Sequence, residues 1–569
     1  MLAVAPEHAP LRVDRVVAAN IAFVIRDETN YVVKNLRQQF NYLYFQDDFK
    51  LSPSLTINAG LRYEIVTPQY ERDNRLANFN PTNNTLVQAG TSGINNRALV
   101  NIRYNNLAPR FGFAYSYSPK TVIRGGYALG YTQTNRAGGE NNLTYNGPDV
   151  VNAAINNFNS AYPTPASLCT SDTQDQTACF RQTQQGYSNV LTSAAYFVPL
   201  KVTSRYIPAN FKTGYVQSYN LGVEQQLPGG VVLGIAYVGN KGTHLQVLAD
   251  YNQAAPCLVT PPATCPTPYQ NRRPVPTFGD IEIAYGGNSS SYNALQIKAE
   301  KRVGALYVLN SFTYSRTFDL ASGHLETSNG DNSRVNFANP RNDYGPAGYD
   351  QPLANTTSIV YDLPYGHGRH FGNNANFVMN ELLGGWQLTT INTMTSGLPF
   401  NLNYSTSSSS GTVPLGTPQG TTQSSIGGLF TTDLATLRPN HIGSTELKLK
   451  PQERVKKATS ISYLPSIANN GTLAYDYPSY TLYGNTTGYG NVSRNSLRSY
   501  SFFQTDLGLH KAFRLWSESS NLDFRAEAFN VLNQVNYQAP DANISDGAFG
   551  TITSAYPARQ LQLALKLIF

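Results

Sequence analysis

The 569-residue sequence lacks any long apolar run. A membrane-spanning helix needs about 20 consecutive, predominantly apolar residues. The best candidate, residues 16–25 (VVAANIAFVI), is too short and is interrupted by Asn20. Charged residues flank this segment on both sides and no small-residue cleavage site follows it, so it does not make a complete signal peptide. The sequence therefore predicts no helical membrane span.

Charged residues, Trp and Met are scarce. Only 14% of the residues are charged, and the chain has 2 Trp and 3 Met, whereas charged residues usually make up about 25% of a protein. Aromatic residues nevertheless reach 12%, because there are 38 Tyr. The net charge of +7 is spread out without a basic run, which predicts no nucleic-acid partner. This composition fits a transmembrane β-barrel, whose faces alternate between lipid and water, and equally a soluble all-β protein.

The four cysteines form two close pairs, Cys169 with Cys179 and Cys257 with Cys265. Each pair lies in a stretch rich in Pro, Thr, Ser and Asn that lacks the alternation of a strand. Locally paired cysteines in loops predict two small disulfides and an oxidising compartment. The alternative is a metal site, which usually has the tighter C-x2-C spacing that neither pair shows.

Alternation of apolar and polar residues is the dominant pattern of the chain. In residues 55–65 (LTINAGLRYEI), every second residue from Leu55 to Ile65 is apolar or aromatic. Residues 110–117 and 121–131 alternate in the same way around a Ser-Pro-Lys turn, which predicts a hairpin. We expect about fifteen such strands, each near the 9–11 residues that a tilted membrane strand needs.

The expected connections between these strands alternate in length. Outer-membrane barrels have short turns at one end and long loops at the other. A soluble sandwich, with its apolar face in a core, has no reason for this asymmetry. The expected fold class is therefore all-β, a large antiparallel transmembrane β-barrel of the outer-membrane type with long extracellular loops. Short turns are expected at residues 118–120, 228–230, 303–304 and 513–520, and long segments at 67–106, 132–213, 241–289, 319–353 and 403–499.

The chain ends on a strand with one apolar face, formed by Leu561, Leu563, Leu565, Leu567 and Phe569. We expect this last strand to pair with the first, because closing a barrel removes the sheet edges. A terminal aromatic residue on such a strand resembles the signal that outer-membrane barrels present to the barrel-assembly machinery. The alternative is an ordinary core strand that happens to come last.

Several segments, in this order, resemble a known family. They are residues 44–64 (YFQDDFKLSPSLTINAGLRYE), 106–116 (NLAPRFGFAYS), 218–245 (SYNLGVEQQLPGGVVLGIAYVGNKGTHL), 290–302 (SSYNALQIKAEKR), 339–346 (NPRNDYGP), 382–400 (LLGGWQLTTINTMTSGLPF) and 522–537 (LDFRAEAFNVLNQVNY), followed by the terminal strand. Together they resemble the TonB-dependent outer-membrane receptors, in particular the Oar-like branch with its carboxypeptidase-regulatory-like module. The resemblance implies an outer-membrane barrel that takes up a substrate with the help of the TonB complex.

The chain departs from that family before its first barrel segments, where no export signal, TonB box, plug domain or regulatory-like module is recognisable. In such receptors the plug blocks the lumen, helps to bind substrate and couples to the TonB complex. TonB would therefore act only through a plug that is missing from this chain. Family barrels also have 22 strands. We expect residues 1–569 to be a partial barrel, incomplete at the N-terminus, from a receptor or a truncated gene product.

Residues with catalytic or metal-binding potential do not form a recognisable set. His367 and His370 lie in a Gly-rich turn without further ligands at metal-site spacing. Asp47 and Asp48 are adjacent on a strand, so their side chains point to opposite faces and cannot act as a carboxylate pair. No phosphate-binding loop and no G-x-S-x-G motif occurs. We therefore predict no catalytic residue, no metal, no cofactor and no enzymatic activity.

Three functions are compatible with these observations. The first is a TonB-dependent transporter in the bacterial outer membrane, embedded in outer-membrane lipid, that takes up an unidentified substrate. The second is a plugless surface or adhesion barrel, or a pore, that binds through its long loops. The third is a soluble secreted β-protein that binds polysaccharide through Tyr and Asn. The ordered segments and the terminal strand favour the first; the substrate-binding residues are unknown.

Overall fold

The computed structural model describes residues 25–29, 34–132, 143–150, 152–156, 197, 199–255, 269–322, 334–404, 438–443, 455–456, 460–464, 474–476, 490–515, 520–544 and 546–569. All four cysteines lie outside these residues, so the two disulfides stay predictions. The chain divides into two units, Met1–Val33 with Tyr145–Val198, and Lys34–Thr144 with Pro199–Phe569. In the first unit, β1 (Ile25–Thr29) pairs antiparallel with β10 (Asn152–Asn156).

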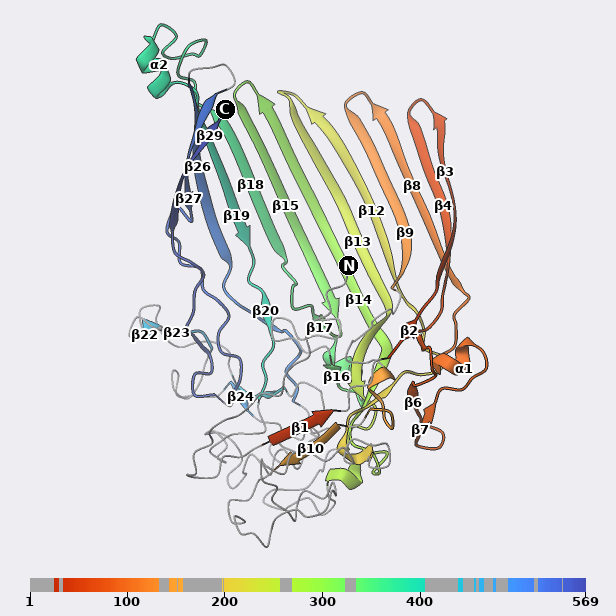
Figure 1. Ribbon diagram of the computed structural model, residues 1–569. Helices are drawn as coiled ribbons and strands as arrows, with labels where there is room; N and C mark the ends of the chain where they lie inside the picture. The colour runs from red at the N-terminus through yellow and green to blue at the C-terminus, as the bar shows by residue number, and fades with distance from the viewer. Residues whose placement is uncertain are drawn as a thin grey trace. The chain divides into compact units, whose positions relative to one another are not determined.

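One large sheet dominates the second unit (Figure 1). It has sixteen strands; thirteen follow one another in chain order, each antiparallel to the next, and β11, β16 and β17 pair beside this path. The sheet is thus an up-and-down meander, and the prediction of a large antiparallel all-β fold is confirmed. The thirteen strands are β3 (Phe40–Ser52), β4 (Leu55–Val66), β8 (Asn106–Ser118), β9 (Thr121–Thr132), β12 (Gly214–Leu227), β13 (Val231–Asp250), β14 (Ile281–Val303), β15 (Leu306–Asp319), β18 (Leu353–Asp362), β19 (Trp386–Thr395), β26 (Phe502–Arg514), β27 (Asn521–Phe529) and β29 (Gln560–Ile568).

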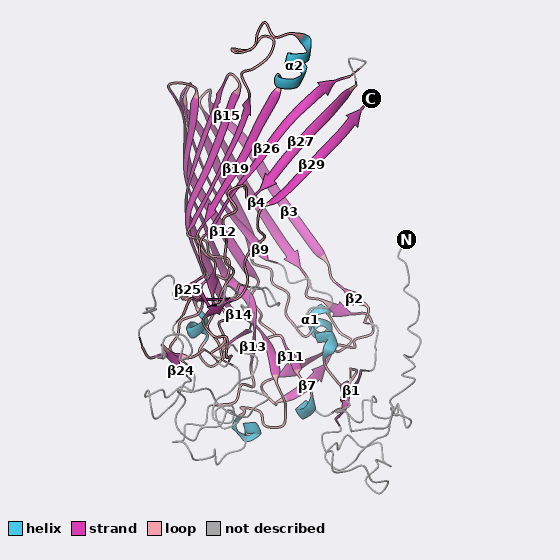
Figure 2. Ribbon diagram, turned by 90° about the vertical axis from the view of Figure 1, so that its left-hand side faces the viewer, coloured by secondary structure: helices cyan, strands magenta, loops and turns pink. Residues whose placement is uncertain are grey.

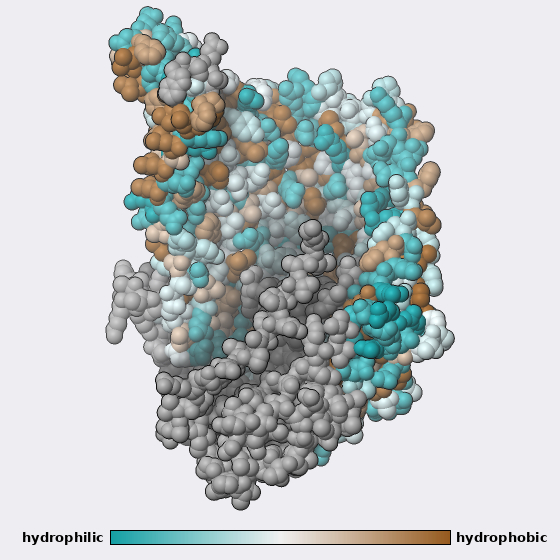
Figure 3. Space-filling model, viewed as in Figure 1, coloured by the Kyte–Doolittle hydropathy of each residue, from teal (hydrophilic) through white to brown (hydrophobic). Residues whose placement is uncertain are grey.

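Tight turns join the strands at one end of the sheet, hereafter the short-turn end. Residues 53–54, 119–120, 228–230 and 304–305 make these turns. Gly229, Gly230 and Gly304 have φ values of 78°, 76° and 56°, which residues with a Cβ rarely adopt. Three of the turns lie where the sequence predicted them. A longer connection at the same end contains α2 (Phe377–Leu383), over which hydrophobic atoms gather at the upper left of Figure 3 (see also Figure 2).

The long connections occupy the opposite end, hereafter the loop end, and carry short elements. β13 and β14 continue into this layer, which explains why they have 20 and 23 residues. Among the described residues, no helix is long and apolar enough to cross a membrane. The short elements are β2 (Leu36–Arg37), β5 (Tyr70–Glu71), β6 (Ala77–Asn80), β7 (Thr85–Gln88), α1 (Ile94–Ala98), β11 (Ser204–Tyr206), β16 (Arg334–Val335), β17 (Gly345–Pro346), β20 (Pro399–Phe400), β21 (Asn440–His441), β22 (Val455–Lys456), β23 (Ser460–Ser462), β24 (Tyr475–Asp476), β25 (Leu497–Arg498) and β28 (Thr551–Ile552), with 3-10 helices at Leu143–Tyr145, Pro199–Lys201, Tyr269–Arg272 and Pro340–Asp343.

The buried apolar cores lie at the loop end. In one of them, the ring of Phe79 lies 5.6 Å from those of Tyr206 and Tyr251 and 5.3 Å from that of Phe278. Such edge-on and tilted aromatic pairs add to the stabilisation that comes from burial. A second core joins residues of the connections that follow β19 and β27, namely Phe400, Leu402, Tyr404, Leu464, Ala474, Tyr475, Val492, Ile544 and Phe549.

The main sheet has two edges. Within the described residues, β3 pairs only with β4, and β29 pairs only with β27. The expected pairing of the last strand with the first is therefore not present between these two strands. The reason is directional: because thirteen strands alternate in direction, β3 and β29 run the same way and cannot form an antiparallel ladder with each other.

Candidate functional site

The register of the sheet collects apolar side chains on one face. Residues opposite each other in an antiparallel pair share a face, so a row can be followed from strand to strand. Ile235 pairs with Val223 on one side and with Ile297 on the other, and Ile297 pairs with Phe312. Further rows on the same face are Phe45–Leu61–Pro109 and Leu388–Leu509–Ala526–Leu563.

Large side chains on this apolar face are exposed instead of packed in a core. Leu61 and Tyr237 are each 46% exposed, and Leu563 is 74% exposed. Soluble monomers rarely expose apolar patches larger than a few hundred Å², and a soluble sandwich turns its apolar face inward. An exposed, predominantly apolar face across the sheet is the arrangement of a sheet that meets lipid.

The opposite face is polar and rich in small residues. Arg110 pairs with Gly60 on one side and with Ala128 on the other, and Ala128 pairs with Ser218. The adjacent row consists of Asn58, Gly112, Gly126 and Asn220. Alternation along each strand therefore leads to two faces of opposite character, with the small polar side chains on the face that would line a wet lumen.

A hollow of about 290 Å³ lies where these two rows cross β3, β4, β8, β9 and β12. Its floor lacks side chains at Gly60, Gly112 and Gly126, and its polar lining includes Arg110 and Asn220. Among the described residues, no carboxylate forms an ion pair with Arg110. Gln46, Asn58 and Ser218 complete the polar lining. This lining makes the hollow a candidate site for a polar ligand that carries a negative group.

Two other cations on the polar face have carboxylates beside them. Arg124 lies 3.9 Å from Glu224, and Lys298 lies 3.0 Å from Glu300. These side chains are exposed, so the pairs contribute little to stability. Compared with Arg124 and Lys298, Arg110 is therefore the better cation for an incoming ligand, because no carboxylate among the described residues pairs with it.

Buried ion pairs hold the loop end together. Arg494 lies 2.7 Å from Asp319, and Arg438 lies 2.5 Å from Asp343. Arg498 bonds to Asp350 in the same region. Asp319, Asp343 and Asp350 belong to β15 and the connection that follows it, and the three arginines belong to the connection after β19. The two long connections are therefore fixed to each other.

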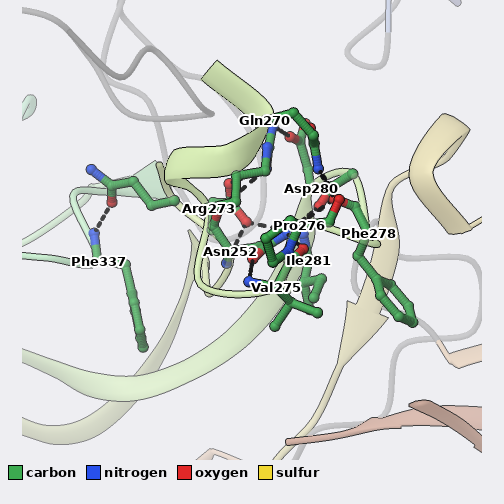
Figure 4. Close-up of polar contacts among 12 residues, drawn as sticks. Asn252, Gln270, Arg273, Val275, Pro276, Phe278, Asp280, Ile281 and Phe337 are labelled. Carbon is green, nitrogen blue, oxygen red and sulfur yellow. Dashed lines mark hydrogen bonds and ion pairs between the residues drawn. The ribbon is translucent and has the colours of Figure 1, made fainter. Parts of the chain in front are cut away.

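A second polar network closes the connection between β13 and β14 (Figure 4). The amide nitrogen of Asn252 donates to the carbonyls of Val275 and Gly279 at 3.0 and 2.7 Å, and its amide oxygen accepts from the backbone N–H of Val275 at 2.7 Å. Arg273 binds Asp280 at 2.6 Å. Because the partners of Asn252 are mostly backbone groups, this network orders the loop instead of presenting a reactive site.

Two titratable groups at the loop end are shifted by their surroundings. Tyr475 is buried in the core described above, and burial raises its pKa to about 12. Burial also raises the pKa of Asp541, and the nearby Asp546 charge acts in the same direction; the backbone N–H of Asn543 opposes both by donating to Asp541. Tyr475 therefore stays neutral at physiological pH.

The terminal-strand residues predicted for barrel assembly lie on β29 and at Phe569, the residue that follows it. Leu561, Leu563 and Leu565 are 67–75% exposed on the apolar face, Leu567 is 49% exposed, and Phe569 is 90% exposed. β29 forms one edge of the sheet. These side chains are thus accessible to a second protein. Their recognition by the assembly machinery stays a prediction.

The other residues singled out in the sequence have local partners. Asp47 lies opposite Ala59 in the apolar row, whereas Asp48 accepts a hydrogen bond from Asn58 at 2.5 Å on the polar face. Their placement on opposite faces is as predicted. His367 contacts the carbonyl of Asn373 at 3.0 Å. No group of three metal-ligating side chains occurs in the part of the chain that the structure describes.

Sequence reasoning missed the hollow around Arg110. The signal was present in the segment RFGF, where Arg110 and Gly112 are the polar-face residues of β8, and in the consecutive glycines of β9. Neither segment shows by itself that Gly60 lies opposite Arg110, because that contact depends on the register between β4 and β8. A glycine on the polar face indicates a hollow only once the residue opposite it on the neighbouring strand is known.

A long meander with one lipid-facing face and one polar face defines a transmembrane β-barrel protein of the outer-membrane type. The chain belongs to the family described as outer membrane beta barrel domain, which matches residues 19–562. It is a protein of the bacterial outer membrane. No curated protein matches its sequence.

Solved structures with a similar fold are outer-membrane transporters and receptors. YddB from Escherichia coli has 10% sequence identity and a TM-score of 0.40, over 94% of this chain and 55% of YddB. The FrpB iron transporter from Neisseria meningitidis (F3-3 variant) has 10% identity and a TM-score of 0.38, over 94% and 46%. The siderophore receptor PiuA from Acinetobacter baumannii has 8% identity and a TM-score of 0.38, over 93% and 43%. The chain thus spans about half the length of these structures.

Proposed function

We propose that this chain forms the wall of a TonB-dependent transporter, of the Oar-like branch, that takes up a polar substrate across the outer membrane. Its apolar face contacts lipid, and its polar face lines the passage. The observation that carries the proposal is the hollow around Arg110, which provides a ligand-sized recess on the face turned away from lipid. The order of receptor-like segments along the sequence supports it.

The lining of the hollow indicates the chemistry of the substrate. Arg110 offers a forked set of N–H donors that suits a carboxylate or phosphate group. Asn58 and Asn220 add amide donors and acceptors, and Ser218 adds a hydroxyl. We infer a hydroxyl- or amide-rich substrate with one anionic group, such as an acidic saccharide or a peptide.

Closure of the barrel requires further strands. Because β3 and β29 run in the same direction, an odd number of additional strands must lie between them in an antiparallel barrel. We propose that other parts of the protein supply these strands and a plug, and that the TonB complex acts on the plug. On this proposal, residues 1–569 are one part of the working receptor.

The test is a nutrient-limited growth screen in the native organism, comparing a deletion of this gene with a deletion of tonB. We expect both deletions to abolish growth on the same anionic nutrient, and a protonophore to stop its uptake in wild-type cells. Uptake that survives the protonophore would instead establish a passive pore. Normal uptake with lost surface attachment would establish the adhesion barrel and refute transport.

A further inference from the structure

The connection between β18 and β19 differs from its neighbours at the short-turn end. It runs over residues 363–385, whereas four neighbouring connections have only two or three residues. α2 occupies its second half and projects beyond the strands (Figure 2). Two residues are enough to reverse the chain between adjacent antiparallel strands. The length of this connection therefore needs an explanation other than chain reversal.

The helix exposes nearly all of its apolar side chains. Phe377 is 75% exposed and Val378 is 62% exposed, and none of its seven residues is buried. Met379, Leu382 and Leu383 are exposed as well. Figure 3 shows the resulting hydrophobic patch at the upper left. In water this cluster is unfavourable, because the free energy falls when apolar surface leaves water.

Polar contacts fix which side of the helix faces outward. The backbone N–H of His367 donates to the Asn380 side chain at 2.9 Å, which turns Asn380 toward the rest of the connection. Successive helical residues are about 100° apart, so Val378 and Leu382 lie on the side opposite Asn380. Asn376 caps the helix by accepting from the N–H of Met379 at 2.8 Å. Val378, Met379, Leu382 and Leu383 therefore form one exposed apolar face, whereas Phe377 lies on the side of Asn380 and Glu381.

The end of the helix is attached to the lipid-facing side of the sheet. The indole Nε1 of Trp386 donates to the carbonyl of Leu382 at 2.9 Å, and the ammonium of Lys511 bonds to the carbonyl of Gly384. Trp386 lies opposite Lys511 in the ladder between β19 and β26, and Phe513 belongs to the same face. The Lys511 ammonium lies 4.9 Å from the centre of the Phe513 ring.

These side chains are typical of a membrane–water boundary. Trp is enriched there because its ring is apolar and its N–H is polar, and Lys places its stem along apolar surface with its charge toward the interface. The end of α2 is therefore held on the lipid-facing side of the sheet, beside side chains of the kind found where the membrane ends. This attachment favours lipid, and not a protein, as the surface that covers the helix.

We propose that α2 lies in the headgroup region of the inner leaflet and anchors the short-turn end of the sheet to phospholipid. Outer-membrane barrels place their short turns on the periplasmic side, which assigns the leaflet. The helix would insert Val378 and Leu382 toward the acyl chains, as amphipathic interfacial helices do. The inference rests on the membrane location of the sheet but not on what the protein transports.

The test is photo-crosslinking of the assembled protein, together with the strands that close its barrel, in vesicles of phosphatidylglycerol and phosphatidylethanolamine. Benzoylphenylalanine replaces Val378 in one variant, which leaves Trp386 and Lys511 intact. The same probe at Leu295, on the lipid-facing face, is the positive control, and at Asn83, in the exposed turn between β6 and β7, the negative control. Mass spectrometry detects phospholipid adducts.

We expect a phospholipid adduct at Val378 with a yield comparable to that at Leu295. We expect no phospholipid adduct at Asn83. Adducts at Leu295 without adducts at Val378 would overturn the inference and leave the membrane-wall proposal standing. A protein–protein product at Val378 would also overturn it, because a second copy would then cover the helix. Absence of adducts at both positions would overturn the inference together with the proposed transporter wall.

Discussion

Arg494 and Asp319 form a buried ion pair across 175 residues of sequence, with 2.7 Å between a guanidinium nitrogen and a carboxylate oxygen. The same nitrogen also donates to the backbone carbonyl of Asp319 at 2.8 Å. One side chain therefore joins the end of β15 to the connection that precedes β26. Together with the pairs Arg438–Asp343 and Arg498–Asp350, this contact fixes the two long connections to each other at the loop end.

Replacing Arg494 by Leu should loosen that layer. The change leaves Asp319 buried without this cation, and loss of one partner of a buried pair typically costs about 3–5 kcal/mol. Urea-dependent proteolysis should show cleavage of the loop end at lower urea than in the wild type, with the sheet still resistant. The exposed pair of Arg72 and Asp73 is the control, and Arg72→Leu should change little.

A charge on the apolar face should be costly, and one on the polar face should not. Ile297 and Gln296 are neighbours near the middle of the ladder between β14 and β15. Ile297→Arg should lower the free energy of unfolding in vesicles by about 2–4 kcal/mol. Gln296→Arg should leave it nearly unchanged. Equal losses in both variants would contradict the assignment of the faces.

Arg110 should contribute to substrate affinity. Hydrogen bonds to a charged group contribute about 1.5–3 kcal/mol, so Arg110→Gln should raise the half-saturating substrate concentration by roughly ten- to a hundredfold. Energised uptake by cells with equal amounts of assembled protein measures this. Arg124→Gln removes a cation of the same face that already has Glu224 beside it. If both variants behaved alike, the hollow would not be the binding site.

Asp541 should make the protein less stable as pH rises. Burial raises its pKa above the ordinary 3.8, so the folded state holds the proton more tightly than the unfolded state. That contribution is present below pH 3.8 and is lost as pH rises through the raised value. Asp541→Asn should therefore increase the melting temperature relative to wild type at pH 7 and lose this advantage near pH 3. Asp546→Asn, which removes the neighbouring charge, should give a smaller change in the same direction.

The terminal aromatic residue should matter for assembly. If the C-terminal strand is read by the assembly machinery, Phe569→Ala should reduce the amount of folded protein in the outer membrane. Ile568→Ala changes the adjacent residue on the other face and should not. Heat-modifiable mobility in gel electrophoresis of membrane fractions measures the folded amount. Equal yields from both variants would make β29 an ordinary edge strand.

The sequence predicted those features of the fold that depend on neighbouring residues. Alternation identified the strands, and Gly229 and Gly230 marked a turn that the structure confirms. The ion pair between Arg494 and Asp319 could not be predicted, because many arginines and aspartates of the long connections have similar neighbours in the sequence. The exposed face of α2 was also missed, because seven residues give no periodicity that distinguishes an interfacial helix from a buried one.

The direction of β3 and β29 has a consequence for the order of events during biogenesis. An edge strand carries unpaired N–H and C=O groups, and each costs several kcal/mol in hydrocarbon, where water cannot satisfy it. On the proposal that further strands close the barrel, the thirteen strands cannot enter the bilayer before those strands join them. Insertion and closure would then be a single step, in which the last ladder forms while both edges are still shielded from the lipid.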